Sequence, residues 1–150
     1  MKIKNLKEAI EFAIKQEDIA IKLYKHLTEI SDNLQAKEEF SRLVKMETEH
    51  KTSLENYEWD KYNIKDREIY FDLKTSDYMV KPDSLKKLSF TESIILAAKR
   101  EKLAVEMYQD FADKYSDNKK LNKFFLQMVE EESRHKYDLE SLYEDLINER

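Results

Sequence analysis

Glycine and cysteine are absent from this chain of 150 residues, and Pro82 is its one proline. Tight turns in β-rich folds depend on glycine and proline, so a turn-rich β architecture is not expected. Without cysteine the chain cannot form disulfides, thiolate nucleophiles or cysteine-ligated zinc and iron–sulfur sites. Their absence is compatible with a reducing compartment.

Long apolar runs and a basic stripe are lacking as well. No run reaches the roughly 18 apolar residues of a membrane span, and residues 1–10 lack the apolar stretch of a signal peptide. The net charge is −5, with acidic and basic residues interleaved along the chain. We therefore expect a cytoplasmic protein that binds neither nucleic acid nor membrane.

The main structural signal of the sequence is the helical spacing of its apolar residues. Charged residues make up 39% of the chain, as is typical of helical bundles. Apolar residues recur at helical spacing in four segments. The predicted helices span about 6–31, 33–59, 90–115 and 117–147. Asn5 and Ser89, each followed by Glu three positions later, resemble capping boxes at the first and third helices.

Residues 60–88 interrupt this periodicity with short aromatic and β-branched runs. The links within the first and second helix pairs are short, so the helices of each pair should be antiparallel. A helix of about 25 residues is roughly 38 Å long, and the 60–88 crossover can run that distance. The second and third helices should then be parallel. We predict a single all-α domain over residues 1–150, a four-helix bundle with one long crossover.

The two predicted helix pairs repeat each other. One set of residues recurs at an offset of 84 and another at an offset of 85. The matched pairs are Ile10/Ile94, Glu17/Glu101, Ala20/Ala104, Tyr24/Tyr108, Phe40/Phe125, Glu47/Glu132, His50/His135 and Leu54/Leu139. The repeat predicts a pseudo-two-fold bundle whose matched polar residues face each other.

Six ionisable residues interrupt the apolar faces of the four predicted helices. We call them the carboxylate–histidine cluster: Glu17, Glu47, His50, Glu101, Glu132 and His135. A buried, unpaired carboxylate is costly and usually takes up a proton. Four carboxylates cannot neutralise one another, whereas two divalent cations balance them and leave the histidines neutral. The cluster therefore predicts a site for two metal ions.

The spacing of the cluster fits the same site. Residues three apart share a helix face, so each Glu-x-x-His pair can reach one metal cluster. One Glu from each of two helices, with a Glu-x-x-His from each of the other two, is the ligand set of dimetal carboxylate bundles. In that scheme Glu47 and Glu132 bridge the ions, and the other four residues are terminal ligands. Iron or manganese suits these ligands, and zinc is an alternative.

Five stretches of sequence resemble the rubrerythrin branch of the ferritin-like superfamily. "EDIAIKLY" and "EKLAVEMY" are similar to its Glu-x-x-Ala-x-x-x-Tyr helices, and "LVKMETEHKTSLE" and "LQMVEEESRHKYDLE" to its Glu-x-x-His helices. The crossover stretch "DLKTSDYMV" is similar to small rubrerythrin-related proteins. The resemblance implies a ferritin-like fold, two iron ions as cofactors, and a role in oxidative stress.

Two departures from the rubrerythrin pattern change what the resemblance implies. Rubrerythrins carry a rubredoxin domain with cysteine-ligated iron, and this chain ends at Arg150 without cysteine. We therefore expect an external electron donor, such as a rubredoxin. Rubrerythrins also carry an extra carboxylate one turn from a third-helix ligand, where Ala98 and Ala104 stand here. Their peroxide-linked ligand switching is therefore not implied.

Three functions are compatible with these observations. The first is a diiron oxidoreductase, a peroxidase or oxidase that reduces hydrogen peroxide or dioxygen. The alternatives are iron storage in a multi-subunit cage, and a non-enzymatic bundle that buffers metal or binds a partner. The first is favoured because the resemblance is to rubrerythrins, and a homodimer is compatible with each.

The other polar residues of the helices have simpler interpretations. Tyr24 and Tyr108 lie two turns from a cluster glutamate on the same face, which predicts core packing with a satisfied hydroxyl, or a supporting role at the metal site. Helical angles place the remaining polar candidates on the outside. The residues expected at the surface are His26, Glu49, Glu130 and Glu131.

Overall fold

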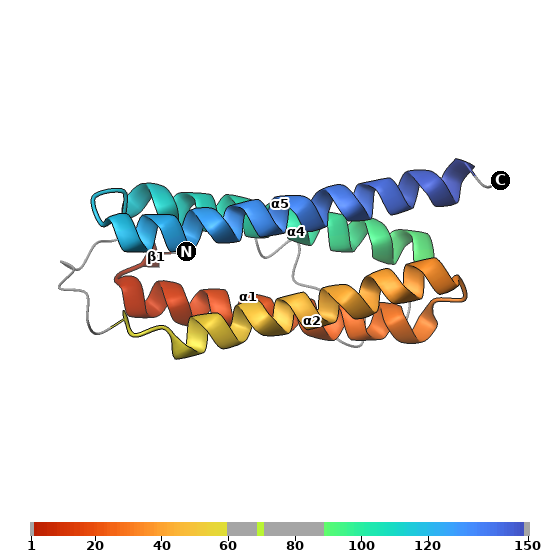
Figure 1. The fold of residues 1–150 in the computed structure, drawn as a ribbon, viewed down its shortest axis with the longest axis horizontal. Coiled ribbons are helices and arrows are strands. Elements are labelled where there is room, and N and C mark those ends of the chain that lie inside the picture. The colour runs from red at the N-terminus through yellow and green to blue at the C-terminus, as the bar shows by residue number, and fades with distance from the viewer. Residues whose placement is uncertain (1, 60–68, 71–88, 149–150) are drawn as a thin grey trace.

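The computed structural model describes residues 2–59, 69–70 and 89–148, and long helices dominate this part of the chain (Figure 1). The helices are α1 (Leu6–Ile30), α2 (Leu34–Asn56), α4 (Phe90–Lys114) and α5 (Lys119–Asn148). α1 packs against α2 and α4 against α5, and α1 also contacts α4. The predicted all-α four-helix bundle is confirmed.

The helix directions agree with the predicted crossover. Figure 1 shows α2 and α4 running the same way, while α1 and α5 run opposite to them. Most of the predicted crossover, 60–88, lies outside the described residues. Its one described piece, β2 (Ile69–Tyr70), pairs antiparallel with β1 (Lys2–Ile3). This two-residue strand pair was not predicted from the sequence.

Polar caps set where each helix begins. The side chain of Asn5 accepts the backbone N–H of Glu8, and that of Ser89 accepts the N–H of Glu92, which confirms both predicted caps. Asn33 and Asn118 make the same bond to the N–H groups three residues on. Such bonds satisfy helix N–H groups that have no partner within the helix. They explain why α2 and α5 start one or two residues later than predicted.

Apolar packing is divided into two clusters along the bundle axis. One contains Tyr108, Phe111 and Phe125 with the N-terminal half of α1. The other contains Tyr24, Phe40 and the C-terminal half of α1. The apolar stripes predicted from the sequence supply most of both clusters. The mid-length of the bundle, between the two clusters, is where polar groups are buried instead. Among the described residues, the helices do not include one apolar and long enough to cross a membrane.

Truncation of Phe125 should test the packing of the first cluster. The Phe125 ring is fully buried and stacks near the rings of Tyr108, Phe111 and Tyr115. Phe125→Ala should lower the free energy of unfolding of the metal-free protein by about 3–5 kcal/mol, because it leaves a cavity. Urea unfolding measures this change. Leu126→Ala is the matched control, since Leu126 is 41% exposed. Equal losses in the two variants would contradict the assigned core.

Candidate metal centre

The six residues of the carboxylate–histidine cluster meet at the middle of the bundle. α1 and α4 each supply one glutamate, and α2 and α5 each supply a Glu-x-x-His pair. All six are buried, and His50 is the most exposed of them at 6%. The predicted residues are therefore brought together. Their role as metal ligands stays a prediction.

Each histidine lies close to a glutamate of the other helix pair. His50 Nδ1 is 2.7 Å from a Glu132 oxygen, and His135 Nδ1 is 2.9 Å from a Glu47 oxygen. The two imidazole rings are nearly parallel, with centroids 5.7 Å apart. Pseudo-two-fold symmetry, predicted from the sequence repeat, is thus visible in the geometry of the site.

The ligand atoms form two overlapping groups of the size that holds a metal ion. One group contains Glu17 and His50, the other contains Glu101 and His135, and both contain Glu47 and Glu132. Within each group the atoms lie within 4.8 Å of one another. Residues shared by two groups occupy the position of bridging ligands. Glu47 and Glu132 are the two residues shared by the groups, and their bridging role stays a prediction.

Buried oxygen atoms without partners indicate that the cluster is built for cations. Both carboxylate oxygens of Glu47 and of Glu132, and Nδ1 of each cluster histidine, are buried and lack a hydrogen bond to any group outside the cluster, and their close neighbours are one another. Burial, and then the nearby carboxylates, raise the pKa of Glu47 and Glu132 well above the ordinary value. Buried polar atoms are normally satisfied, and divalent ions would satisfy these. The residues present therefore fit a two-metal centre.

Two tyrosines donate hydrogen bonds to cluster glutamates from across the bundle. The Tyr108 hydroxyl, on α4, donates to Glu17 on α1 over 2.6 Å. The Tyr24 hydroxyl, on α1, donates to Glu101 on α4. Burial and the adjacent carboxylates raise the pKa of both hydroxyls, so they remain donors at neutral pH. The hydroxyls are satisfied as predicted, and their partners are the cluster glutamates.

Glu131 is a correction to the surface residues expected from the sequence. Its side chain is half-buried, and Oε2 lies 2.7 Å from His50 Nε2. With Nδ1 turned to the cluster, the Nε2–H group of His50 donates a hydrogen bond to the Glu131 carboxylate. Burial lowers the His50 pKa, but the nearby carboxylates of Glu131, Glu47 and Glu17 raise it by more, so that the net pKa is about 9. Glu49 and Glu130 are exposed as expected, whereas His26 is half-buried.

Arg100 is a buried cation that the sequence analysis missed. It is 4% exposed, donates to the backbone carbonyl of Gln16, and has an unpartnered Nε. Burial lowers the Arg100 pKa, but Glu17 and Glu101 more than compensate, so it stays charged. The sequence signal that could have identified Arg100 was its position directly before the cluster residue Glu101. The positive charge of Arg100 offsets the negative charge of Glu131, so two divalent ions still balance the site.

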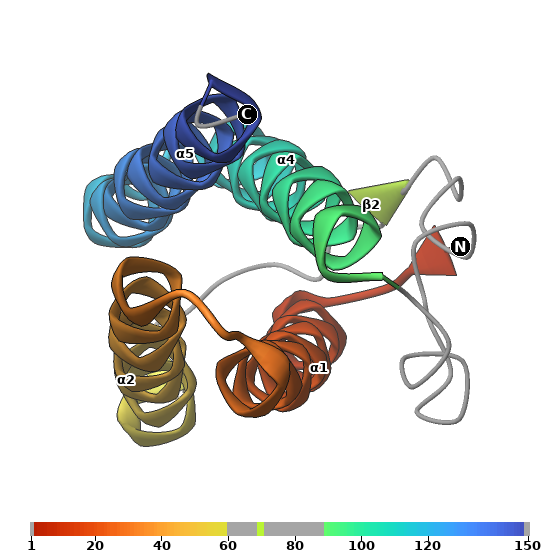
Figure 2. The same cartoon turned by 90° about the vertical axis from the view of Figure 1, so that its right-hand side faces the viewer.

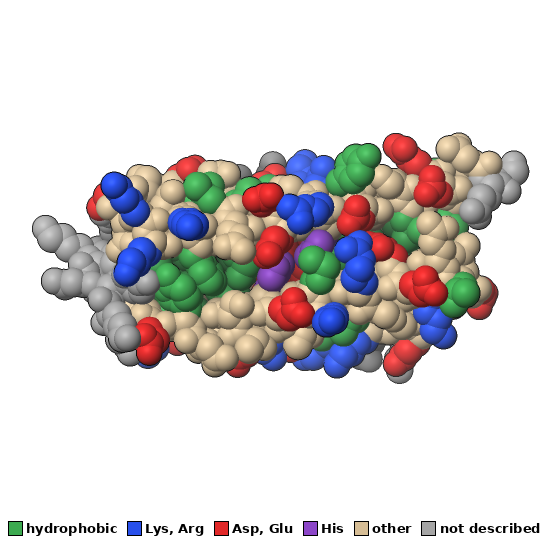
Figure 3. All heavy atoms as spheres, viewed as in Figure 1, with side chains coloured by type: hydrophobic (Ala, Val, Ile, Leu, Met, Phe, Trp, Pro, Cys, Tyr) green, Lys and Arg blue, Asp and Glu red, His purple; other side chains and the backbone are tan. Residues whose placement is uncertain are grey.

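One side of the cluster lies near the surface between α2 and α5. Histidine atoms are visible along this seam in Figure 3, with acidic and basic side chains around them. The side chain of Glu131, which bonds His50, is 31% exposed. Small molecules could therefore approach the cluster from the α2–α5 face.

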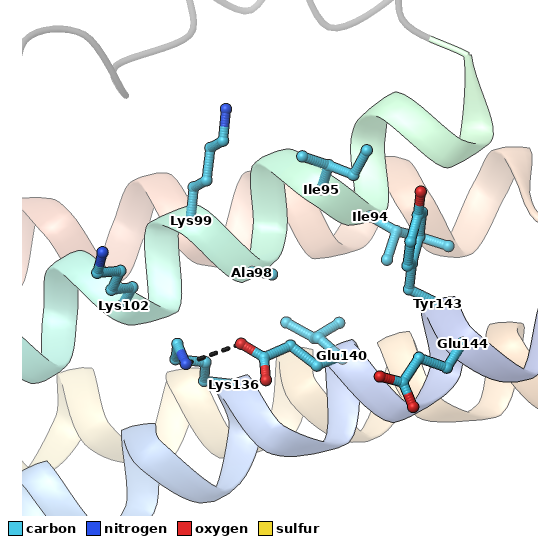
Figure 4. A pocket seen from close by; sticks show the side chains of 10 residues that line it. Ile94, Ile95, Ala98, Lys99, Lys102, Lys136, Glu140, Tyr143 and Glu144 are labelled. Atoms are coloured by element: carbon cyan, nitrogen blue, oxygen red, sulfur yellow. Dashed lines mark ion pairs between the residues drawn. The ribbon is translucent and has the colours of Figure 1, made fainter.

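A separate pocket of about 370 Å³ lies between α4 and α5 (Figure 4). Its lining combines apolar side chains, Ile94 and Leu139 among them, with a polar rim that includes Lys136. Lys136 Nζ lies 2.7 Å from a Glu140 oxygen, as the dashed line shows. Ala98 lines the pocket three residues before Glu101. Among the described lining residues, none is a member of the carboxylate–histidine cluster.

The four-helix bundle and its buried cluster of four glutamates and two histidines resemble a dimetal carboxylate bundle. The sequence model of the rubrerythrin family matches residues 92–150, which include most of α4 and all of α5. This part of the chain is therefore similar to rubrerythrins. A hypothetical protein from Pyrococcus furiosus has a similar structure, with a TM-score of 0.66 and 24% identity. The likeness covers 96% of this chain and 91% of that one. A search of curated proteins found no match.

The pH dependence of stability should report the buried carboxylates. With a raised pKa in the folded state, Glu47 and Glu132 stabilise the metal-free protein fully below pH about 4.5, and this contribution is lost as pH rises. Between about pH 5 and pH 8 these carboxyls are ionised in the unfolded chain but resist ionisation in the folded one. The free energy of unfolding should therefore fall with rising pH, by up to roughly 1.4 kcal/mol per pH unit for each such carboxyl. Urea unfolding of a Glu47→Gln, Glu132→Gln variant should lack this part of the fall. Parallel pH profiles for the two proteins would contradict the assignment.

Proposed function

We propose that this protein is a non-haem diiron oxidoreductase that reduces hydrogen peroxide or dioxygen. The observation that carries the proposal is the set of buried, partnerless oxygen and nitrogen atoms in two overlapping groups. When bound, two Fe(II) ions supply the two electrons that convert hydrogen peroxide to two waters, with protons drawn from solvent. Iron is proposed because carboxylate and imidazole ligands suit it and because the family match is to rubrerythrins.

The side chains of the bundle would hold the ions and control what reaches them. Glu47 and Glu132 would bridge the ions, with Glu17, His50, Glu101 and His135 as terminal ligands. Tyr24 and Tyr108 hold the terminal carboxylates in place by donating hydrogen bonds to them. The apolar clusters on both sides leave the α2–α5 seam as the approach for a small oxidant.

Electrons for repeated turnover must come from outside the described bundle. The chain has no cysteine for an iron–sulfur or rubredoxin centre. We therefore propose an external electron-donor protein of the rubredoxin type, which would reduce the ions between turnovers. A cytoplasmic location would supply such a donor.

Metal loading tests the proposal first. The metal-free protein is loaded anaerobically with Fe(II), bound metal is counted, and the visible spectrum is followed on adding hydrogen peroxide or dioxygen. We expect about two irons per chain and a ferric charge-transfer absorption on oxidation. The Glu47→Ala, Glu132→Ala variant should lose both, because it removes the two shared ligands.

The matched control is Glu49→Ala, Glu130→Ala, which removes exposed glutamates on the same two helices. This control should retain iron and the absorption change. A faster reaction with peroxide than with dioxygen would support peroxidase activity. A large multi-subunit assembly that accumulates iron would favour the storage alternative. Fewer than two irons, or no spectral response, would contradict the oxidoreductase.

A further inference from the structure

The sequence repeat relates the six cluster residues in pairs, but it does not extend to the residues that can contact the outer nitrogens of the two histidines. At the offset of 85 that matches Glu132 with Glu47, the counterpart of Glu131 is Met46. A carboxylate in one helix pair is thus replaced by a thioether in the other. The pseudo-symmetry of the cluster is broken at this position.

The hydrogen bonds of the two histidines differ accordingly. His50 Nε2 lies 2.7 Å from Glu131 Oε2. Among the described residues His135 Nε2 has no hydrogen-bond partner, although it is buried. Met46 Sδ is a weak acceptor, and it lies 3.8 Å from the Arg42 guanidinium. The outer nitrogen of His50 therefore bonds a carboxylate. At the position in the first helix pair that matches Glu131, the repeat has the Met46 thioether, which lies next to the Arg42 guanidinium.

A carboxylate on the outer nitrogen changes a histidine as a metal ligand. It holds the proton on Nε2, directs the Nδ1 lone pair at the metal and makes the imidazole more basic. Loss of such a partner typically lowers metal affinity by about 10- to 100-fold. His50 has this support and His135 does not.

The second buried charge near the cluster does not make the same distinction. Arg100 interacts electrostatically with both Glu17 and Glu101, which are the terminal carboxylates of the two groups. Its effect is therefore shared between the two metal positions. Glu131 also interacts electrostatically with His135, but its hydrogen bond is to His50, so this bond distinguishes the two positions.

We propose that the two metal positions are unequal, and that Glu131 is the positioning residue that makes them so. The ion held by Glu17, His50 and the two bridging glutamates binds first and more tightly. The ion at Glu101 and His135 binds second and exchanges more readily. This inference rests on the proposed two-metal site and adds an order of loading to it.

Titration of the metal-free, full-length chain with Co(II) under nitrogen tests the inequality. Calorimetry and the visible Co(II) absorption should resolve two steps whose affinities differ by about 10- to 100-fold. His50→Ala should remove the tighter step, and His135→Ala the weaker one. Equal affinities for the two ions would overturn the inference and leave the two-metal site intact. Failure to bind a second ion would overturn both.

Two reciprocal substitutions test the role of Glu131. Glu131→Met copies the other half of the repeat, and it should weaken the first step by about 10- to 100-fold while leaving the second. Met46→Glu should strengthen the second step, which a merely structural role of Glu131 cannot explain. Glu130→Met, at an exposed neighbour, is the control and should change neither step. The inference is overturned if neither reciprocal substitution changes the difference between the steps.

Discussion

Four buried carboxylates at the middle of a helical bundle are the constraint on which the rest of this structure depends. Their oxygen atoms lie between two apolar clusters, and most of them lack hydrogen-bond partners. Such a group is tolerable only if it is protonated or if it binds cations. The same residues are therefore a source of instability without metal and the proposed source of function with it.

The apolar packing around the carboxylate–histidine cluster offsets the cost of burying these carboxylates. Two apolar clusters, one on each side of the carboxylate–histidine cluster, bury the apolar side chains that stabilise the bundle, because its middle buries polar groups instead. Tyr24 and Tyr108 link these clusters to the site, because each ring packs with phenylalanines while its hydroxyl bonds a glutamate of the opposite helix pair. Packing and ligand orientation are thus carried by the same side chains.

The repeat gives the site its two-fold geometry, and the exceptions to the repeat give it direction. The six cluster residues match in pairs, whereas Glu131 and Arg100 have Met46 and Gln16 as counterparts. Arg100 interacts with the terminal glutamates of both groups, whereas Glu131 hydrogen-bonds the histidine of one group, His50. Inequality between the two metal positions is the physical consequence that we propose.

The sequence by itself determined the bundle, its caps and the six cluster residues. Apolar spacing identifies helix faces, and ionisable residues within those faces must be buried, so this part of the site follows from local periodicity. Glu131 was misplaced on the surface because helical angle ignores the neighbouring helix, and His50 on α2 is what draws it inward. Arg100 was missed because the carbonyl that it bonds, that of Gln16, lies on α1, 84 residues away, and the strand pair β1–β2 also joins segments far apart in sequence. Only the tertiary structure decides such contacts, since they depend on how the two helix pairs meet.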